Sequence, residues 1–343
     1  MFSLDQIEHP IVQAPMGGGP SRPELAAAVA EAGGLGFLAA GYKPVDAVRR
    51  DVAALRALSA RPFGVNLFAP PRDGAREEAV AAYAATLRGL GPLGVPRHDD
   101  DGWEEKLALV REERVPVVSF TFGCPERGVV DDLHGAGCAV WVTVTAVVEA
   151  RIALDSGADA LVVQGVEAGG HRGSFDDGAP GELGLLALLQ VVAAEVDLPL
   201  VATGGIATGR GVAAVLAAGA AAAQLGTAFM LAPEAGTPAA HRAALGGDAP
   251  TALTRAFTGR LARGIENRFM REHGADAPSA YPDVHHLTAP LRAAARERGD
   301  ADGLHLWAGQ AYGLAVAEPA GELVRRLAEG AREALREAAG RVG

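Results

Sequence analysis

The feature of this sequence that most constrains its fold is a repeated alternation of short apolar runs with helical segments. Eight such runs occupy residues 11–16, 35–40, 63–68, 115–122, 139–145, 160–164, 200–203 and 222–226. Most connections between them have a helical pattern, and several end at a glycine, a usual C-terminal cap. Strands that are apolar on both faces and joined by helices are typical of a buried parallel sheet. Eight such units predict a (β/α)8 TIM barrel, with an open doubly wound sheet as the alternative.

The rhythm of strand and helix stops after residue 232. Residues 233–271 read as mostly helix and turn, and helical patterns return over residues 288–298, 304–316 and 322–341. We therefore expect a barrel domain of residues 1–232, completed by a C-terminal helix at 318–343, and a smaller, mostly helical cap domain of residues 233–317 over the barrel mouth. The third connection between strands is expected to hold a helix at 76–90 and an elaborated loop.

Charge and cysteine content exclude several classes of protein. Lys and Arg total 31 against 42 Asp and Glu, and the net charge of −11 argues against a surface for nucleic acid or anionic membranes. Cys124 and Cys138 lack the spacing of metal ligands, which favours two reduced thiols in a reducing compartment. No signal peptide is expected at the acidic N-terminus, and the uncharged stretch 212–232 is rich in Ala and Gly and reads as buried core rather than a membrane span. We expect a cytoplasmic protein.

The stretch 161–173, read LVVQGVEAGGHRG, carries the first candidate site. An apolar run ends at Gln164, and a loop with Gly169, Gly170 and His171 follows. A glycine-floored loop after a barrel strand can present chemistry at the mouth, and His171 is a candidate base or donor that titrates near neutrality. Arg172 could neutralise an anion or pair with Glu167. The alternative for the whole stretch is a glycine turn with a surface histidine.

Small residues and carboxamides stand at the ends of other predicted strands. Ala14, Pro15 and Met16 precede a glycine run, which suits a flat ring lying against backbone, although an ordinary glycine-rich turn is the alternative. Asn66, Gln164 and Gln224 lie at or near the ends of the third, sixth and eighth strands. A carboxamide both donates and accepts, as the edge of a heteroaromatic ring requires, and buried amides need partners. For Asn66 alone, a capped turn is the alternative.

Glycines after the seventh and eighth strands predict an anion site. Gly204 and Gly205 precede a helix that begins near residue 208, and the segment Gln224, Leu225, Gly226 and Thr227 follows the last strand. Backbone N–H groups at these two positions form the usual phosphate site of this barrel. A site that binds a phosphate and also binds the edge of a ring through carboxamides suits a mononucleotide. FMN is the default mononucleotide in such barrels. We find no dinucleotide fingerprint and expect no metal, because the adjacent His285 and His286 point apart.

Five segments together resemble a known family. They read QAPM at 13–16, QGVEAGGHRG at 164–173, ATGGI at 202–206, QLGTAF at 224–229 and LWAGQ at 306–310. Over nearly the whole chain the sequence resembles the nitronate monooxygenases, formerly called 2-nitropropane dioxygenases, and the last segment favours their class I branch. The resemblance implies FMN-dependent oxidation of alkyl nitronates, such as propionate 3-nitronate, by O2 to a carbonyl compound and nitrite.

The resemblance also implies roles for individual residues. Asn66, Gln164, Gly169, Gly205 and Gln224 to Thr227 match FMN-binding positions of the family, and His171 matches its base, which takes the α-proton of a neutral nitroalkane or assists a bound nitronate. Candidates to line the substrate pocket from the cap, with ordinary packing as the alternative for each, are Tyr281, Trp307, Gln310 and Tyr312.

Two other functions remain open from the sequence. The first is an FMN-dependent reductase that uses NAD(P)H, acting on enoyl-acyl-carrier protein or quinones, because such enzymes share the barrel and a glycine–glycine–histidine loop. The second is a flavin-binding protein without turnover, because one histidine is a thin catalytic set. The expected partners are a small nitronate and O2, and we expect a monomer or a homodimer.

Overall fold

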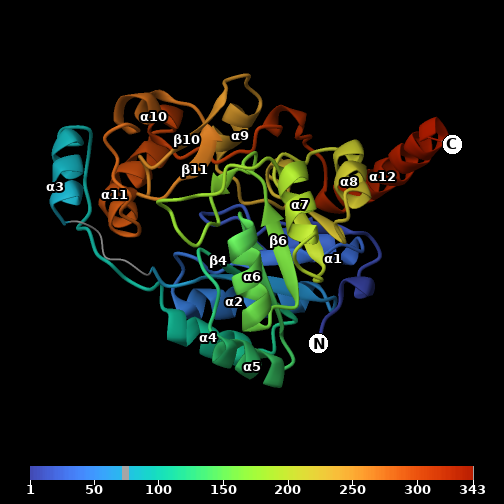
Figure 1. Ribbon diagram of the computed structural model, residues 1–343. Coiled ribbons are helices and arrows are strands. Elements are labelled where there is room, and N and C mark those ends of the chain that lie inside the picture. The colour runs from blue at the N-terminus through green and yellow to red at the C-terminus, as the bar shows by residue number, and fades with distance from the viewer. Residues whose placement is uncertain (72–76, 343) are drawn as a thin grey trace.

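Eight parallel strands close into a barrel (Figure 1). The computed structural model describes residues 1–71 and 77–342. Each strand pairs in parallel with the next around the barrel, and a backbone bridge between Val12 and Leu35 joins the first to the second. The predicted barrel is thus confirmed and the open sheet is excluded. In spatial order the strands are β1 (Ile11–Gln13), β9 (Ala222–Leu225), β8 (Leu200–Thr203), β6 (Ala160–Gln164), β5 (Ala139–Val144), β4 (Val117–Thr121), β3 (Phe63–Phe68) and β2 (Gly36–Ala39).

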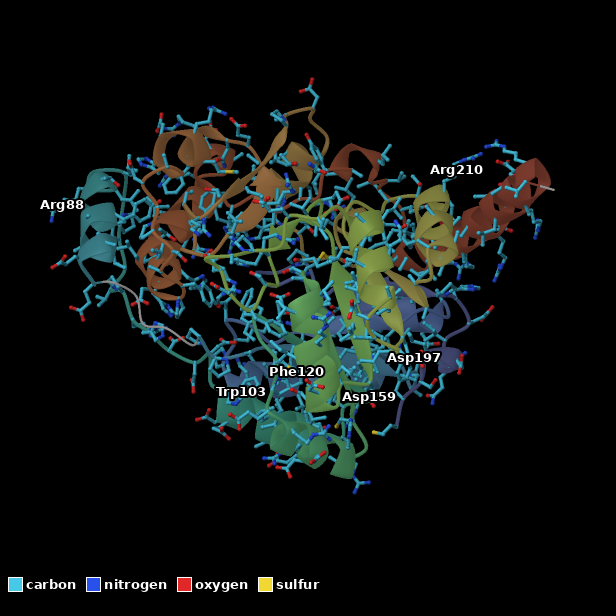
Figure 2. The ribbon with its side chains drawn as sticks, viewed as in Figure 1. Arg88, Trp103, Phe120, Asp159, Asp197 and Arg210 are labelled. Atoms are coloured by element: carbon cyan, nitrogen blue, oxygen red, sulfur yellow. The ribbon has the colours of Figure 1, made fainter. Side chains whose placement is uncertain are left out.

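Helices cover the outside of the barrel because every strand also presents apolar side chains outward. Trp103 at the start of one helix, for example, packs edge-on against Phe120 of β4 with ring centroids 5.6 Å apart (Figure 2). None of the helices in residues 1–71 and 77–342 is long and apolar enough to cross a membrane. The covering helices are α1 (Pro23–Glu31), α2 (Val45–Leu58), α4 (Trp103–Glu112), α5 (Arg127–Gly135), α6 (Val147–Ser156), α7 (Leu185–Ala193) and α8 (Gly209–Ala217).

The inside of the barrel is apolar at its base and polar at its mouth. Val162 and Val201 belong to the buried apolar cluster at the base, where the N-terminal residues that include the short 3-10 helix η1 (Leu4–Gln6) also pack. Successive side chains of a strand alternate between its two faces, so the residue two positions later points to the same interior. Those positions are Gln164 and Thr203, both at the carboxyl ends of their strands. The barrel therefore turns amides and hydroxyls toward one open end.

A cap lies over that end. It contains α9 (Ala239–Leu245), α10 (Arg268–His273), α11 (Asp283–Glu297) and the 3-10 helices η3 (Ala301–Gly303) and η4 (Tyr312–Leu314), while η2 (Thr227–Phe229) follows the last barrel strand. An antiparallel sheet that the sequence did not predict, in the order β10 (Thr251–Thr254), β11 (Ala262–Ile265) and β7 (Gly170–His171), joins cap and barrel. Its strands, of two to four residues, are too short to show alternation. The sheet fixes the backbone of His171 against the cap.

One segment crosses the predicted domain boundaries, and the C-terminal helix lies against the barrel as expected. The helix expected at 76–90 is α3 (Glu77–Thr86), and it lies beside α11 of the cap rather than on the barrel wall (Figure 1). Its Tyr83 is buried with the cap residue Phe257, and the Tyr83 hydroxyl donates to the carbonyl of Ala256 at 2.7 Å. The C-terminal helix α12 (Ala320–Val342) packs against α8 and α1 of the barrel. The division at residues 232 and 318 stays a prediction, and the packing places α3 on the cap side.

Candidate active site

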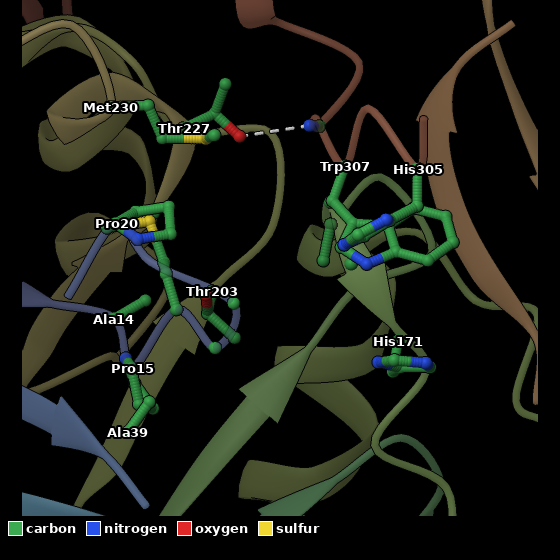
Figure 3. Close-up of a pocket in the computed structure, with 18 of the residues that line it drawn as sticks. Ala14, Pro15, Pro20, Ala39, His171, Thr203, Thr227, Met230, His305 and Trp307 are labelled. Atoms are coloured by element: carbon green, nitrogen blue, oxygen red, sulfur yellow. Dashed lines mark hydrogen bonds between the residues drawn. The ribbon is translucent and has the colours of Figure 1, made fainter. Parts of the chain in front are cut away.

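A cavity of about 320 Å3 opens between the barrel mouth and the cap. Figure 3 shows His171, His305 and Trp307 on one side of it and Ala14 and Ala39 on the other. Most of the site residues predicted from the sequence line this one cavity. They are Ala14, Pro15, Met16, Asn66, Gln164, Gly169, Gly170, His171, Gly204, Gly205, Gln224, Leu225, Gly226, Thr227, Trp307 and Tyr312.

Two predicted cap residues do not line the cavity, and a third is engaged elsewhere. The side chain of Gln310 is exposed, and only its backbone N–H reaches the site loop, donating to the carbonyl of Glu167 at 3.0 Å. Tyr281 lies behind His171, edge to face, with ring centroids 6.1 Å apart. Tyr312 lines the cavity, but its hydroxyl donates to the carbonyl of Ala249 at 2.6 Å, which is a packing contact.

The three carboxamides differ in how much hydrogen-bonding capacity they keep. The oxygen of Asn66 accepts from the hydroxyls of Ser119 at 2.9 Å and Thr121 at 3.0 Å, so both N–H groups of its amide remain for a ligand. Gln164 accepts from the backbone of Gly173 at 2.8 Å and donates to the carbonyl of His171 at 3.0 Å, so one N–H remains. The buried amide of Gln224 has no hydrogen bond to any residue in the described part of the chain. Such a buried, unpaired amide calls for a ligand partner.

The loops after β8 and β9 hold the backbone that an anion would use. Gly204 and Gly205 have φ angles of +123° and +67°, which side chains rarely adopt. α8 begins shortly after them and directs its free N–H groups toward this end of the barrel. A Cβ added at Gly226 would be in van der Waals contact with Ala14 Cβ at 3.5 Å and with Met16 Sδ at 3.6 Å, so the glycine keeps this loop clear of the cavity. The hydroxyl of Thr227 accepts from the backbone N–H of Gly309 at 3.0 Å, which ties this loop to the cap (Figure 3).

Gly169 is required by a close approach of two backbone segments. A Cβ at this position would collide with Ala308 and Gly309 of the cap. Gly170, in contrast, has open space around it but a φ of +77°. The paired glycines thus let the loop pass under the cap and then turn His171 into β7.

His171 is held in one orientation on the cavity wall. Its Nε2 lies 2.9 Å from the hydroxyl of Thr258, and that hydroxyl donates to the carbonyl of Arg260 at 3.2 Å. Both contacts are satisfied when Thr258 donates to Arg260 and Nε2 of His171 carries the imidazole proton. This tautomer leaves Nδ1 unprotonated, and Nδ1 has no protein partner in the described chain. Burial, with the nearby charges of Arg260 and Arg292, lowers the pKa of His171 to about 3. The expectation that it titrates near neutrality is therefore wrong, because this pKa makes the imidazole neutral at pH 7.

Arg172 has neither of the roles considered from the sequence. Its guanidinium is buried and donates to the carbonyls of Gly165 at 2.6 Å and Gly181 at 2.9 Å, so it holds the loop together. The carboxylate of Glu167 accepts from the backbone N–H of Leu185 at 3.0 Å, at the start of α7, rather than pairing with Arg172.

The sequence missed the second wall of the cavity. Tyr42, His285, Arg292 and His305 all line it, and none was singled out as a site residue. Burial raises the pKa of Tyr42 to about 12, and its ring stacks on His285 with centroids 4.0 Å apart. His285 and Arg292 lie seven residues, or two turns, apart on α11, but the sequence predicted a helix only from residue 288, so it did not mark these two residues as a pair.

His285 and His286 are in edge-to-face contact, with ring centroids 5.2 Å apart, but of the two it is His285 that lines the cavity. His286 turns away from the cavity and lies 2.9 Å from the carboxylate of Asp99. Within residues 1–71 and 77–342, no group of three or more His, Cys, Asp or Glu side chains could hold a metal ion.

Comparisons with known proteins bear on the whole chain. The family model described as nitronate monooxygenase matches residues 1–330. A nitronate monooxygenase from Pseudomonas aeruginosa is 43% identical, over 94% of this chain and 96% of its own length. The structure of a nitroalkane oxidase from Streptomyces ansochromogenes is 53% identical, with a TM-score of 0.94 over 98% of this chain and 99% of that one. FabK from Thermotoga maritima is more distant, at 28% identity and a TM-score of 0.78, over 98% of this chain and 97% of that one.

Proposed function

Because the chain belongs to the nitronate monooxygenase family, a family of flavin-dependent oxidoreductases, we propose that its cavity binds FMN and that the enzyme oxidises alkyl nitronates with O2 to a carbonyl compound and nitrite. The observation that carries the proposal is a neutral, buried imidazole whose Nδ1 is free, on the wall of a cavity that also holds unpaired amides. The reductase alternative is less supported, because relatives that are 43% and 53% identical are named for nitronate or nitroalkane oxidation, whereas FabK is 28% identical.

The residues present fit FMN. The free N–H groups of Asn66 and the amide of Gln224 can form hydrogen bonds to the edge of a flavin ring. The small side chains of Ala14 and Ala39 leave space for a flat ring. The backbone of Gly205 and Gly226 would hold the phosphate. When bound, FMN supplies the electron acceptor and the centre that reacts with O2.

His171 favours a substrate that arrives as an anion. A neutral imidazole with a strongly lowered pKa is a weak base toward a neutral nitroalkane. A bound nitronate places a negative charge beside the ring, offsets the charges of Arg260 and Arg292, and raises the pKa of His171. We therefore propose that Nδ1 of His171 assists the bound nitronate, and that removal of an α-proton from a neutral nitroalkane is the slower use of the same atom.

The partners follow from this chemistry. We propose a small nitronate and O2 as reactants, with the cap excluding bulk water from them. Monomer or homodimer stays the prediction for the assembly.

Anaerobic mixing tests the proposed function. The purified protein should be yellow and release FMN on denaturation, ethyl nitronate should bleach the flavin without oxygen, and NADH should not. His171→Asn should retain FMN and lose more turnover with neutral nitroethane than with ethyl nitronate. Rapid bleaching by NADH would move the assignment to a reductase, and a colourless protein that FMN cannot reconstitute would remove every flavin-dependent function.

A further inference from the structure

Arg292 is a buried cation without an acidic partner. Its side chain is 7% exposed and lines the cavity from α11. Nε donates to the hydroxyl of Thr288 at 3.1 Å and Nη2 donates to the carbonyl of His285 at 2.9 Å, while Nη1 has no hydrogen bond to any described residue. No carboxylate forms an ion pair with it among residues 1–71 and 77–342. A buried charge is costly unless something compensates it, so this guanidinium requires an anion.

His285 is oriented as a second donor beside it. Nη2 of Arg292 lies 3.2 Å from Nδ1 of His285, and since arginine can only donate, Nδ1 is the unprotonated nitrogen. Burial and the charge of Arg292 lower the pKa of His285 to about 2, so the ring is neutral and its proton is on Nε2. Stacking on Tyr42 holds the ring plane at the cavity wall.

The other arginines near the cavity are engaged or exposed. Arg260 donates to the carbonyls of Ser174 and Arg172, and its guanidinium carbon lies 4.0 Å above the ring of Phe122. Arg296, one turn after Arg292 on α11, also lines the cavity but is exposed to water, which weakens any charge interaction it makes.

We propose that Nη1 of Arg292 and Nε2–H of His285 form an oxyanion site in the cap that binds the two oxygens of the substrate's nitro group. This inference rests on the proposed function for the identity of the substrate. A nitronate is planar and carries its charge on those oxygens, which suits a guanidinium and a neighbouring N–H donor. The site belongs to the cap, and the backbone of His171 is joined to the cap because β7 pairs with β11. The position of the bound oxygens relative to the His171 imidazole is therefore fixed.

Nitrate is the probe, because it is planar, anionic and carries oxygens on nitrogen, yet cannot be oxidised. Nitrate is titrated calorimetrically at low ionic strength into the flavin-loaded protein, whose phosphate site is filled. The variants are Arg292→Gln, Arg292→Lys and His285→Phe, which keeps the stack on Tyr42. Arg296→Gln is the matched control, because it removes an exposed arginine from the same helix.

The expected result is specific to the two donors. Arg292→Gln should weaken nitrate binding by roughly ten- to a hundredfold, as loss of a charged hydrogen bond predicts, and should raise KM for ethyl nitronate more than it lowers kcat. Arg292→Lys and His285→Phe should lose less, and Arg296→Gln should bind nitrate within about twofold of the unmodified protein.

Three results would overturn the site: no nitrate binding by the unmodified protein, equal binding by Arg292→Gln, or an equal loss in Arg296→Gln. If Arg292→Gln does not fold, judged by thermal unfolding, Arg292→Lys and His285→Phe decide the question alone. A protein that takes up no flavin would refute the proposed function instead, and the same titrations on the flavin-free chain would still compare the four variants.

Discussion

Replacing Thr258 by valine tests the account of His171. The Thr258 side chain is buried, 2% exposed, and its hydroxyl is the only described partner of the His171 ring nitrogens. Valine keeps the branched shape and removes the acceptor, so the Nε2–H group of His171 is left buried and unpaired. An unsatisfied buried donor costs about 1–3 kcal/mol, and here that cost falls on the tautomer that leaves Nδ1 unprotonated. The ratio of that tautomer to the one protonated on Nδ1 should fall by roughly ten- to a hundredfold.

The assay follows the tautomer and the turnover together. Nitrogen NMR of the labelled imidazole distinguishes a protonated from an unprotonated Nδ1, and kcat with ethyl nitronate is measured on flavin-loaded protein. Thr258→Val should shift the His171 signals and lower kcat at unchanged flavin content, whereas Thr258→Ser, which keeps the hydroxyl, should match the unmodified protein. Wild-type signals and wild-type kcat in Thr258→Val would refute the reasoning.

Three further predictions concern FMN binding by Asn66, the stability of the protein at acid pH, and the loop that Arg172 holds. Asn66→Asp keeps the acceptor for the two hydroxyls but loses both N–H donors, so FMN should bind roughly tenfold more weakly in a fluorescence titration; unchanged affinity would remove the amide from flavin binding. The pKa values of His171, His241 and His285 are lowered to about 3, 4 and 2, chiefly by burial, so the unfolded chain binds more protons below pH 6.5. Stability should therefore be fully present above pH 6.5 and fall as the pH drops toward 4, by about 1.4 kcal/mol per pH unit for each histidine; a flat free energy of unfolding from pH 7 to 4.5 in urea titrations would contradict this. Arg172→Met should lower stability by at least about 2 kcal/mol, because its guanidinium satisfies buried carbonyls; loss of turnover at full stability would instead make it a substrate-binding group.

Much of the barrel could be predicted because its signals are local. Runs such as 160–164 are apolar on both faces, and a polar residue at the end of such a run, such as Gln164, lies at the barrel mouth because the carboxyl ends of parallel strands meet there. Glycines after the seventh and eighth strands were informative for the same reason. All of these residues belong to the same repeated unit, so the chain order alone places them at one end.

The cap could not be predicted to the same depth, because its contribution depends on packing between distant segments. β7 is two residues long and exists only because β11 pairs with it, His171 with Ala262 and Gly170 with Arg263, 91 and 93 positions later. The lowered pKa of His171 likewise depends on burial by the cap and on Arg260 and Arg292. The helix at 76–90 was expected, but its sequence did not indicate whether it would pack against the barrel or against the cap.

The position of α3 has a consequence for how the enzyme can be rebuilt. α3 lies between β3 and β4 in the chain, yet it buries Val80 and Tyr83 among residues of α11 and its neighbours. The cap is therefore built from two separate segments of the chain, α3 and the residues after the last barrel strand. Deleting residues 233–317 would remove the residues that pack against α3 and expose its apolar side chains to water. A transfer of this cap to another barrel has to include both α3 and residues 233–317.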